Sequence, residues 1–213
     1  ENQIAEAAQY GVHAMSWGVE GYSLLVSSLH SSKQGVFDQF HFVKACIAAN
    51  LNLNHCQRIL LQGSDRLLML VNIGNTLGNL SWKHLQLPSV YTHDSWPLQL
   101  VSVSPDGSHI AVGGKKGFVL LNVGTGVWSL FGDRMEEQSI RCVGISWYRH
   151  FLVTVVWHEQ LKTHQVMFFP RTSKLAFSSL AFRANVPQQK TPTYLDCNDS
   201  NLILFTSDAY FQY

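Results

Sequence analysis

Short apolar runs separated by turn residues recur along the whole chain, and none keeps a 3.6-residue apolar period beyond about two helical turns. The runs are rich in Val, Ile, Leu, Phe and Trp, which fit the pleated, half-buried surface of a sheet. Gly, Pro, Asn and Asp separate them, as is typical of tight turns. The pattern therefore predicts an all-β protein.

The clearest unit begins at Trp96 and ends before Gly132. Four strands are predicted within it, at residues 97–103, 109–112, 118–123 and 127–131. The turns between them have the sequences SPDG, GGKKG and GTG. Four antiparallel strands joined by tight turns form one blade of a β-propeller, here of the WD-repeat-like kind.

The unit repeats along the chain. The apolar strand that follows each polar turn begins near Tyr22, Ile59, Ile110, Phe151 and Leu202. These starts are separated by 37, 51, 41 and 51 residues, near the period of about 40–45 residues expected for four-stranded blades. A single blade cannot bury both faces of its sheet, so neighbouring blades must stack against it. We predict four to five blades, in part or whole, over residues 1–213, with no internal domain boundary.

The ends of the chain and two internal segments complete this picture. Because Glu1 is not an initiator methionine and Tyr213 falls inside a predicted strand, we expect a fragment of a larger propeller protein. Residues 44–54 fit the pattern least, either as a strand with a long connection or as a short helix. Residues 190–193, with Pro187 just before them, are interpreted as a loop between blades, since proline cannot donate to a strand ladder.

Charge and hydrophobic content exclude several classes of protein. Fifteen basic and fourteen acidic residues give a net charge of +1, too little for a general footprint on nucleic acid or anionic membrane. The longest apolar stretch, residues 151–157, is far shorter than the roughly 20 residues of a membrane helix. Any attachment to a membrane is therefore expected to be indirect. The sequon at residues 79–81 is interpreted as a chance match.

Cysteine usage bears on the compartment. Cys46, Cys56, Cys142 and Cys197 form no C-x-x-C pair of the kind found in zinc or thioredoxin-like sites. We interpret them as free thiols in strands, which is typical of a reducing cytosolic setting.

Two glycine-containing segments resemble phosphate-binding loops without meeting their requirements. Residues 113–117 lack the G-K-[ST] order and the following helix that supply a metal ligand and an amide cradle. Residues 122–126 lack the third glycine of the dinucleotide fingerprint and lie between strands. Both are interpreted as hairpin turns.

Ten histidines are present, but no H-E-x-x-H or H-x-H pattern aims two of them at one metal. His158 and His164 are six residues apart, which suits neither a helical face nor adjacent same-face strand positions. Residues 144–147 (GISW) lack the nucleophile elbow G-x-S-x-G, although spatial triads are not excluded by order alone. We therefore assign no catalytic, cofactor-binding or metal residue and expect no cofactor.

Two further features are interpreted structurally. Residues 133–137 (DRMEE) form a charged cluster after a strand, more typical of a solvated loop than of a docking motif. The tryptophans are expected to fill gaps between blades rather than to serve as exposed binding anchors. They are Trp17, Trp82, Trp96, Trp128, Trp147 and Trp157.

The amino-acid sequence of the central blade resembles that of a known family, the Ric family of WD-repeat propeller subunits. The likeness covers much of the first 140 residues and is looser at Trp147 and residues 171–173. It is carried by residues 94–98 (DSWPL), 110–118 (IAVGGKKGF), 128–132 (WSLFG), 137–138 (EQ), 16–22 (SWGVEGY) and 60–67 (LLQGSDRL).

The resemblance implies a propeller-bearing subunit of the Ric and Rgp guanine-nucleotide exchange complex for a Golgi Rab GTPase. A cytosolic protein recruited peripherally to Golgi membranes and acting in retrograde traffic is then expected, with an Rgp partner subunit and a Rab GTPase as binding partners and no nucleic acid. Exchange factors shift a GTPase toward its nucleotide-free state and perform no covalent chemistry. The matching segments supply no catalytic residue.

Two alternatives remain open at this stage. One is a propeller scaffold of a vesicle coat or tether, which has the same architecture. The other is a propeller hydrolase with polar groups around the central channel, and strand residues such as 101–103 (VSV) offer it little acid, base or metal capacity.

Overall fold

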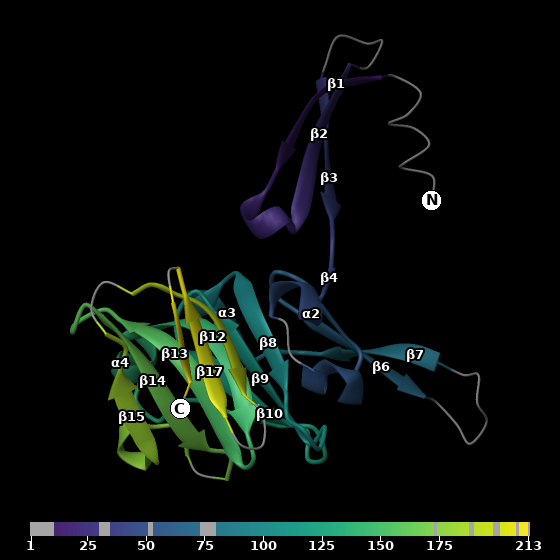
Figure 1. The fold of residues 1–213 in the computed structure, drawn as a ribbon. Coiled ribbons are helices and arrows are strands. Elements are labelled where there is room, and N and C mark those ends of the chain that lie inside the picture. Colours follow the sequence, from purple (N-terminus) through teal and green to yellow (C-terminus); the bar gives the residue numbers. More distant parts are fainter. Residues whose placement is uncertain are drawn as a thin grey trace. The chain divides into compact units, whose positions relative to one another are not determined.

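A computed structural model describes residues 11–29, 35–50, 53–72, 80–172, 174–187, 190–197, 201–207 and 209–212 (Figure 1). The chain forms two compact units, residues 1–44 and 45–213. The expectation of no domain boundary within residues 1–213 stays a prediction. The two units are described separately.

The first unit contains one antiparallel three-stranded sheet with the order β1-β2-β3. Its strands are β1 (Val12–Trp17), β2 (Ser23–Leu29) and β3 (Gly35–His41), and a short 3-10 helix, η1 (Val19–Gly21), connects β1 to β2. The Lys44 ammonium lies 4.4 Å from the centre of the Tyr22 ring. Every side chain of β1 is exposed, whereas Val26 in β2 is only 4% exposed.

The second unit contains four antiparallel sheets, here called sheets A to D, each with its strands in sequence order. Sheet A comprises β4 (Lys44–Ala45, at the boundary), β5 (Leu60–Gln62), β6 (Leu67–Asn72) and β7 (Leu80–Leu85). Sheet B comprises β8 (Leu98–Val103), β9 (His109–Gly114), β10 (Phe118–Asn122) and β11 (Val127–Ser129). Sheet C comprises β12 (Ile140–Tyr148), β13 (Phe151–His158), β14 (Thr163–Pro170) and β15 (Phe182–Asn185). Sheet D comprises β16 (Pro192–Cys197), β17 (Leu202–Thr206) and β18 (Tyr210–Gln212).

The repeat predicted from the sequence is present in the strand order. The five predicted strand starts fall at or next to β2, β5, β9, β13 and β17, each the second strand of its sheet. The four strands predicted for the central unit correspond to β8–β11. A shared irregularity supports the repeat, because β1, β8, β12 and β16 each carry a register shift against the following strand. The all-β propeller class is thus confirmed.

Residues 44–54 combine both structures that the sequence left open. After β4 comes the one-turn helix α2 (Cys46–Ala49), and a 3-10 helix, η2, spans Leu53–Gln57. Asn50, only 6% exposed, donates from Nδ2 to the carbonyls of Val101 (3.1 Å) and Ile145 (2.8 Å). It thereby satisfies backbone acceptors on the first strands of sheets B and C, which have no neighbouring strand on that side. The segment ties two blades together.

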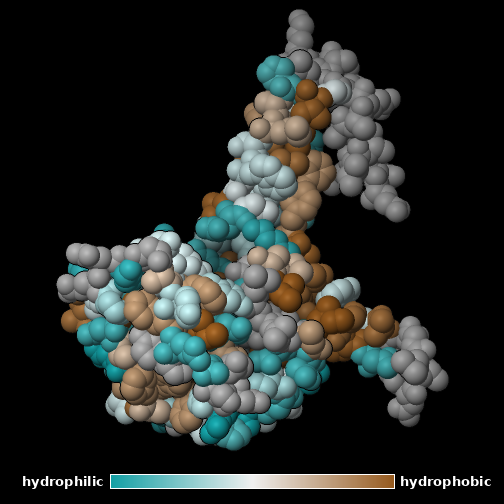
Figure 2. Space-filling view, in the orientation of Figure 1, coloured by the Kyte–Doolittle hydropathy of each residue, from teal (hydrophilic) through white to brown (hydrophobic). Residues whose placement is uncertain are grey.

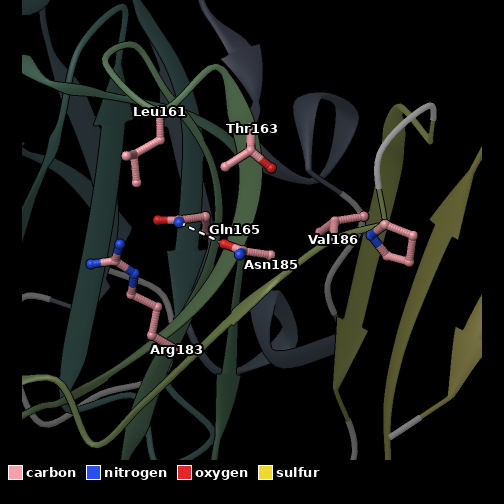
Figure 3. A pocket seen from close by; sticks show the side chains of 7 residues that line it. Leu161, Thr163, Gln165, Arg183, Asn185 and Val186 are labelled. Carbon is pink, nitrogen blue, oxygen red and sulfur yellow. Dashed lines mark hydrogen bonds between the residues drawn. The ribbon is translucent and has the colours of Figure 1, made fainter.

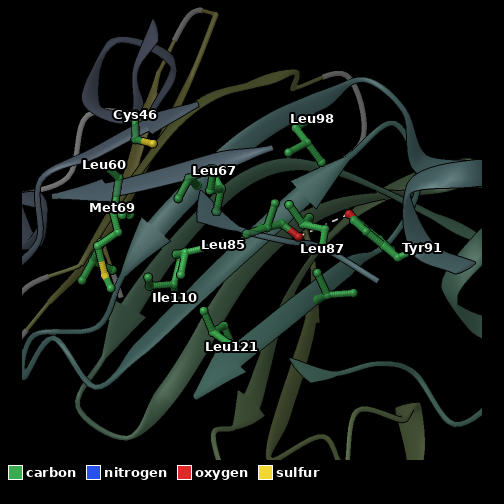
Figure 4. Close-up of a cluster of buried hydrophobic side chains, with 14 residues drawn as sticks. Cys46, Leu60, Leu67, Met69, Leu85, Leu87, Tyr91, Leu98, Ile110 and Leu121 are labelled. Atoms are coloured by element: carbon green, nitrogen blue, oxygen red, sulfur yellow. Dashed lines mark hydrogen bonds between the residues drawn. The ribbon is translucent and has the colours of Figure 1, made fainter. Parts of the chain in front are cut away.

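Three apolar clusters occupy the spaces between sheets. The first includes Leu67, Leu98, Ile110 and Val119, from sheets A and B (Figure 4). The second joins sheets B and C, and its Phe118, Phe131 and Phe169 rings meet edge to face with centroids 5.0–5.9 Å apart. The third joins sheets C and D. Sheets B and C are thus covered on both faces by a neighbouring sheet.

Short helices lie in the connections between strands. Helix α3 (Ser89–Ser95) joins sheets A and B, α4 (Arg134–Gln138) joins B and C, and the 3-10 helix η3 (Phe177–Ser179) lies between β14 and β15. Among the residues described, no helix is long and apolar enough to span a bilayer. The loop predicted at 190–193 is shorter than expected, because Pro192 is the first residue of β16, a position that needs no ladder donor.

The structure corrects two expectations about individual side chains. All four cysteines are free thiols, but only Cys142 and Cys197 lie in strands, since Cys46 is in α2 and Cys56 in η2. Of the tryptophans only Trp147 is fully buried, while Trp17, Trp82 and Trp96 are 63%, 45% and 46% exposed. Trp17 and Trp82 lie on edge strands, β1 and β7, and Trp96 follows the end of α3. Apolar residues that include Leu80 and Trp82 gather on the surface over β6 and β7 (Figure 2).

Candidate interaction surface

The segments that resembled nucleotide loops are hairpin turns, as predicted. Residues 113–117 connect β9 to β10, and Gly117 has a φ of 57°, a conformation that favours glycine. A Cβ at Gly117 would meet Glu137 Cγ at 2.3 Å, so this turn packs closely against helix α4. Residues 122–126 form the turn before β11, where Asn122 Oδ1 accepts from Thr125 N (3.1 Å).

The described histidines form no cluster that could hold a metal. In the part of the chain that the structure describes, no three His, Cys, Asp or Glu side chains are grouped so as to hold an ion. Trp157 pairs with His164 across β13 and β14, so the adjacent His158 points to the opposite face of sheet C. Burial, followed by the nearby Arg183, lowers the pKa of His158. The two histidines therefore cannot act on one group.

Residues 133–137, expected to be a solvated loop, are the N-cap and the first four residues of helix α4, and they bridge two connectors. Asp133 caps the helix by accepting from Met135 N at 2.8 Å. Arg134 donates to Asp94, at the end of α3, which also accepts from Gln138 Nε2 at 2.8 Å. His93 and Arg134 hold the pKa of Asp94 at about 2. The charged side chains Asp133 and Arg134 of this cluster therefore bond to other groups of the protein.

Glu137, the last acid of that helix, has a different environment. Its side chain is only 8% exposed, and burial, together with the negative charge of Asp94, raises the pKa of Glu137 to about 7. A carboxyl group that is neutral in mildly acidic solution is thus packed against the β9–β10 turn at Gly117. In a catalytic cleft such a group would be a candidate acid, but Glu137 does not line the cavities described below.

A second network joins sheets B and C at the β8–β9 turn. Asp106 accepts from Ser104 Oγ (2.6 Å), from Ser108 Oγ (2.7 Å) and from Arg171 Nη1 (2.6 Å), the last reaching across from the end of β14. Although burial raises the pKa of Asp106, these hydrogen bonds outweigh it and hold the pKa well below its ordinary value. The turn is consequently fixed to the neighbouring blade.

Sheet C is strongly basic. Residues 140–190 contain seven of the chain's fifteen Lys and Arg residues but only one of its fourteen acids, Glu159. The near-zero net charge of the chain conceals this asymmetry. A local excess of one sign creates a potential that attracts partners of the opposite charge.

Two cavities lie at the end of sheet C where β13 turns into β14. The larger, about 620 Å³, is lined by Gln165 and Thr163 from β14, by Arg183 and Asn185 from β15, and by neighbouring residues (Figure 3). The smaller, about 370 Å³, has three cationic or imidazole side chains, Lys162, His164 and Lys190. The two share Thr163, Val186 and Pro187, and neither is lined by a carboxylate. This surface is suited to binding anionic or hydrogen-bonding groups.

Apart from Pro187, the residues lining the larger cavity were not singled out from the sequence. Gln165, Arg183 and Asn185 lie in two strands, and no motif joins them. The signal that would have found the region is the run of cations without acids at 140–190. Arg183 comes to line the cavity beside Gln165 only because β14 pairs with β15. In that pairing Gln165 lies opposite Asn185 and Met167 lies opposite Arg183.

Antiparallel sheets of three or four strands, stacked on one another through apolar clusters in the second unit, are the architecture of a β-propeller. The family model described as the RIC1 second beta propeller domain matches residues 57–213. The chain therefore belongs to the RIC1 second β-propeller domain family, and the sequence resemblance to the Ric family is confirmed.

Curated relatives agree with this assignment. The chain is 26% identical over 247 aligned positions to the human guanine nucleotide exchange factor subunit RIC1, covering 93% of this chain and 17% of the relative. The mouse protein of the same description is 26% identical, with 77% and 15% covered. The fission yeast subunit is 25% identical, with 67% and 13% covered. The chain thus spans less than a fifth of the length of these relatives.

Solved structures show a weaker likeness. The Kluyveromyces lactis Hsv2 structure superposes with a TM-score of 0.49 at 8% identity, over 92% of this chain and 65% of that chain.

Proposed function

We propose that this segment is a non-catalytic scaffold within a subunit of a guanine-nucleotide exchange complex. The observation that carries the proposal is membership in the RIC1 second-propeller family, whose curated relatives are named exchange factor subunits. The sheets themselves support a scaffold, since their polar clusters at Asp94 and Asp106 fasten blade to blade. A fastened set of blades is a rigid platform for partners.

The finer parts of the proposal come from the resemblance of residues 94–138 to the Ric family. We propose that the complete protein acts with an Rgp partner subunit on a Rab GTPase of the Golgi, in retrograde traffic. It is then a cytosolic protein that associates peripherally with Golgi membranes. Its action is a population shift, in which the complex binds the nucleotide-free GTPase more tightly than the loaded one.

The test uses the full-length protein together with its Rgp partner. Golgi Rab proteins are immobilised either nucleotide-free, after removal of magnesium, or loaded with GTP, and capture of the complex is compared. Preferential capture by the nucleotide-free form, with accelerated release of a fluorescent GDP, is the expected result. Equal capture of both forms, or capture of neither, contradicts the exchange function. A Rab of another compartment is the matched control.

A further inference from the structure

We propose that the larger cavity of sheet C, beside β15, binds an extended acidic segment of a partner protein, with a carboxylate of that segment on Arg183. The proposal goes beyond nucleotide exchange and does not depend on it. It names a surface and the chemistry of its occupant.

The first argument is that Arg183 is a cation without a partner in the described structure. The neighbouring cations Arg171 and Lys162 lie 2.6 Å from Asp106 and 3.5 Å from Glu159, respectively. Arg183 is exposed, lines the cavity, and forms no ion pair or hydrogen bond with any described residue. A guanidinium presents a planar fork of donors that matches a carboxylate in two parallel hydrogen bonds. The cavity therefore favours a carboxylate.

The second argument is an unsatisfied acceptor in the cavity wall. Gln165 is only 1% exposed, and its Nε2 donates to Asn185 Oδ1 at 2.7 Å. Its Oε1 is buried with no donor in the described structure. In Figure 3 this oxygen points away from Asn185, toward the side where Leu161 and Arg183 lie. Because buried polar atoms are almost always hydrogen-bonded, an N–H from an occupant is the group this wall lacks.

The third argument is the free edge of the sheet. Strand β15 is the last of sheet C, and no described strand pairs with its outer side. Phe182, Arg183 and Asn185 on this strand are all exposed. An edge strand offers a row of unpaired backbone groups, and an extended peptide can pair with them as an additional strand. The occupant is therefore expected to be extended.

Together these features favour a polypeptide over an anionic membrane. A bilayer presents a plane of headgroups, which does not enter a cavity and has no extended backbone to pair with β15. The basic excess of residues 140–190 attracts either partner at a distance, but only a chain with backbone N–H groups and acidic side chains uses all three features.

The test measures binding of short fluorescein-labelled peptides to the full-length protein at low ionic strength. One peptide alternates Val and Glu, and a matched peptide alternates Val and Lys. We expect the acidic peptide to bind and Arg183→Glu to weaken it by about tenfold or more. Lys174→Glu is the matched control, because Lys174 is an exposed cation of the same region that lines neither cavity, and it should change the affinity by less than about twofold.

A second variant tests the cavity wall rather than the charge. Gln165→Leu keeps the size of the side chain and removes its amide, so the acidic peptide should bind more weakly while circular dichroism stays unchanged. Equal loss in R183E and K174E, equal binding of the lysine peptide, or an effect of R183E only on phosphatidylserine vesicles overturns the proposal. The exchange measurement is separate: if it fails while R183E still abolishes peptide binding, only the proposed function falls.

Discussion

Sheets B and C are neighbouring four-stranded blades that use their charged residues in opposite ways. Around sheet B the acidic side chains form hydrogen bonds within the protein, as Asp94 and Asp106 each accept several from adjoining elements. Sheet C carries the cations, and Arg183 faces solvent without a partner in the described structure. The comparison teaches that blades of the same architecture can use charged side chains differently. In one blade they hold neighbouring elements together, and in the next they are exposed to possible partners. The predictions below test that contrast.

The largest effect is expected from Gly114→Ala in sheet B. A Cβ at Gly114 would lie 2.0 Å from the Ser95 carbonyl oxygen, and backbone cannot move aside cheaply. Overpacking of this kind should cost about 3 kcal/mol. Gly132→Ala is the control, because a Cβ there meets nothing within 4 Å. Hydrogen exchange of β9 in the full-length protein measures the loss, and similar exchange in both variants would refute the close-packing argument.

Next in size is Asp106→Asn, which tests the fastening between sheets B and C. The amide cannot accept equally from Ser104, Ser108 and Arg171, so we expect a loss of about 1 kcal/mol, moderated because the carboxylate is half exposed. The pKa of Asp106 is lowered by folding, so its contribution is present above the ordinary pKa and disappears as the pH falls. The variant should therefore match the wild type in acid.

The exposed pair of Asp65 and Arg66 supplies the control for that experiment. Asp65→Asn disrupts an ion pair whose side chains are both about half exposed, and it should leave stability at neutral pH nearly unchanged. Urea denaturation followed by the Trp fluorescence of the domain compares the two variants. If D65N costs as much as D106N, the network at the β8–β9 turn has no special role.

Glu137→Gln is expected to stabilise the protein increasingly as the pH rises above 4.5, with the full effect above about pH 7. The pKa of Glu137 rises on folding from 4.5 to about 7, so the folded state binds more protons between these values. The wild type therefore loses stability as the pH rises through this window, and the neutral amide does not. The melting temperature of E137Q should exceed that of the wild type by roughly 2–4 °C at pH 8 and match it below pH 4.5. An equal shift at both pH values would indicate altered packing instead.

The smallest effect on stability is expected from the cations of sheet C. Arg183→Glu and Lys174→Glu alter exposed side chains that make no ion pair with a described residue, so each should change the free energy of unfolding by less than about 0.5 kcal/mol. Thermal unfolding of both variants measures this. A large loss in R183E would place Arg183 among the residues that hold the blade together, and sheet C would then resemble sheet B.

The sequence by itself determined the strands and their repetition. Alternating apolar runs, tight turns such as residues 104–107 and regular spacing are local properties, so β8–β11 and the second strand of every sheet were predictable. Residues 113–117 and 122–126 were also predictable as turns. The family was recognisable because the matching segments, such as residues 110–118, are contiguous in the sequence.

Only the tertiary structure decided which charged side chains form ion pairs within the protein and which remain exposed. Asp94 meets Arg134 across forty residues and Asp106 meets Arg171 across sixty-five, so no local pattern reveals either contact. Whether a tryptophan is buried, as Trp147 is, or exposed, as Trp17 is, depends on whether another sheet covers that face. The cavity at Gln165 and Arg183 likewise exists only where β14 and β15 pair. The physical reason is that strand formation responds to neighbours along the chain, whereas burial and charge pairing respond to neighbours in space.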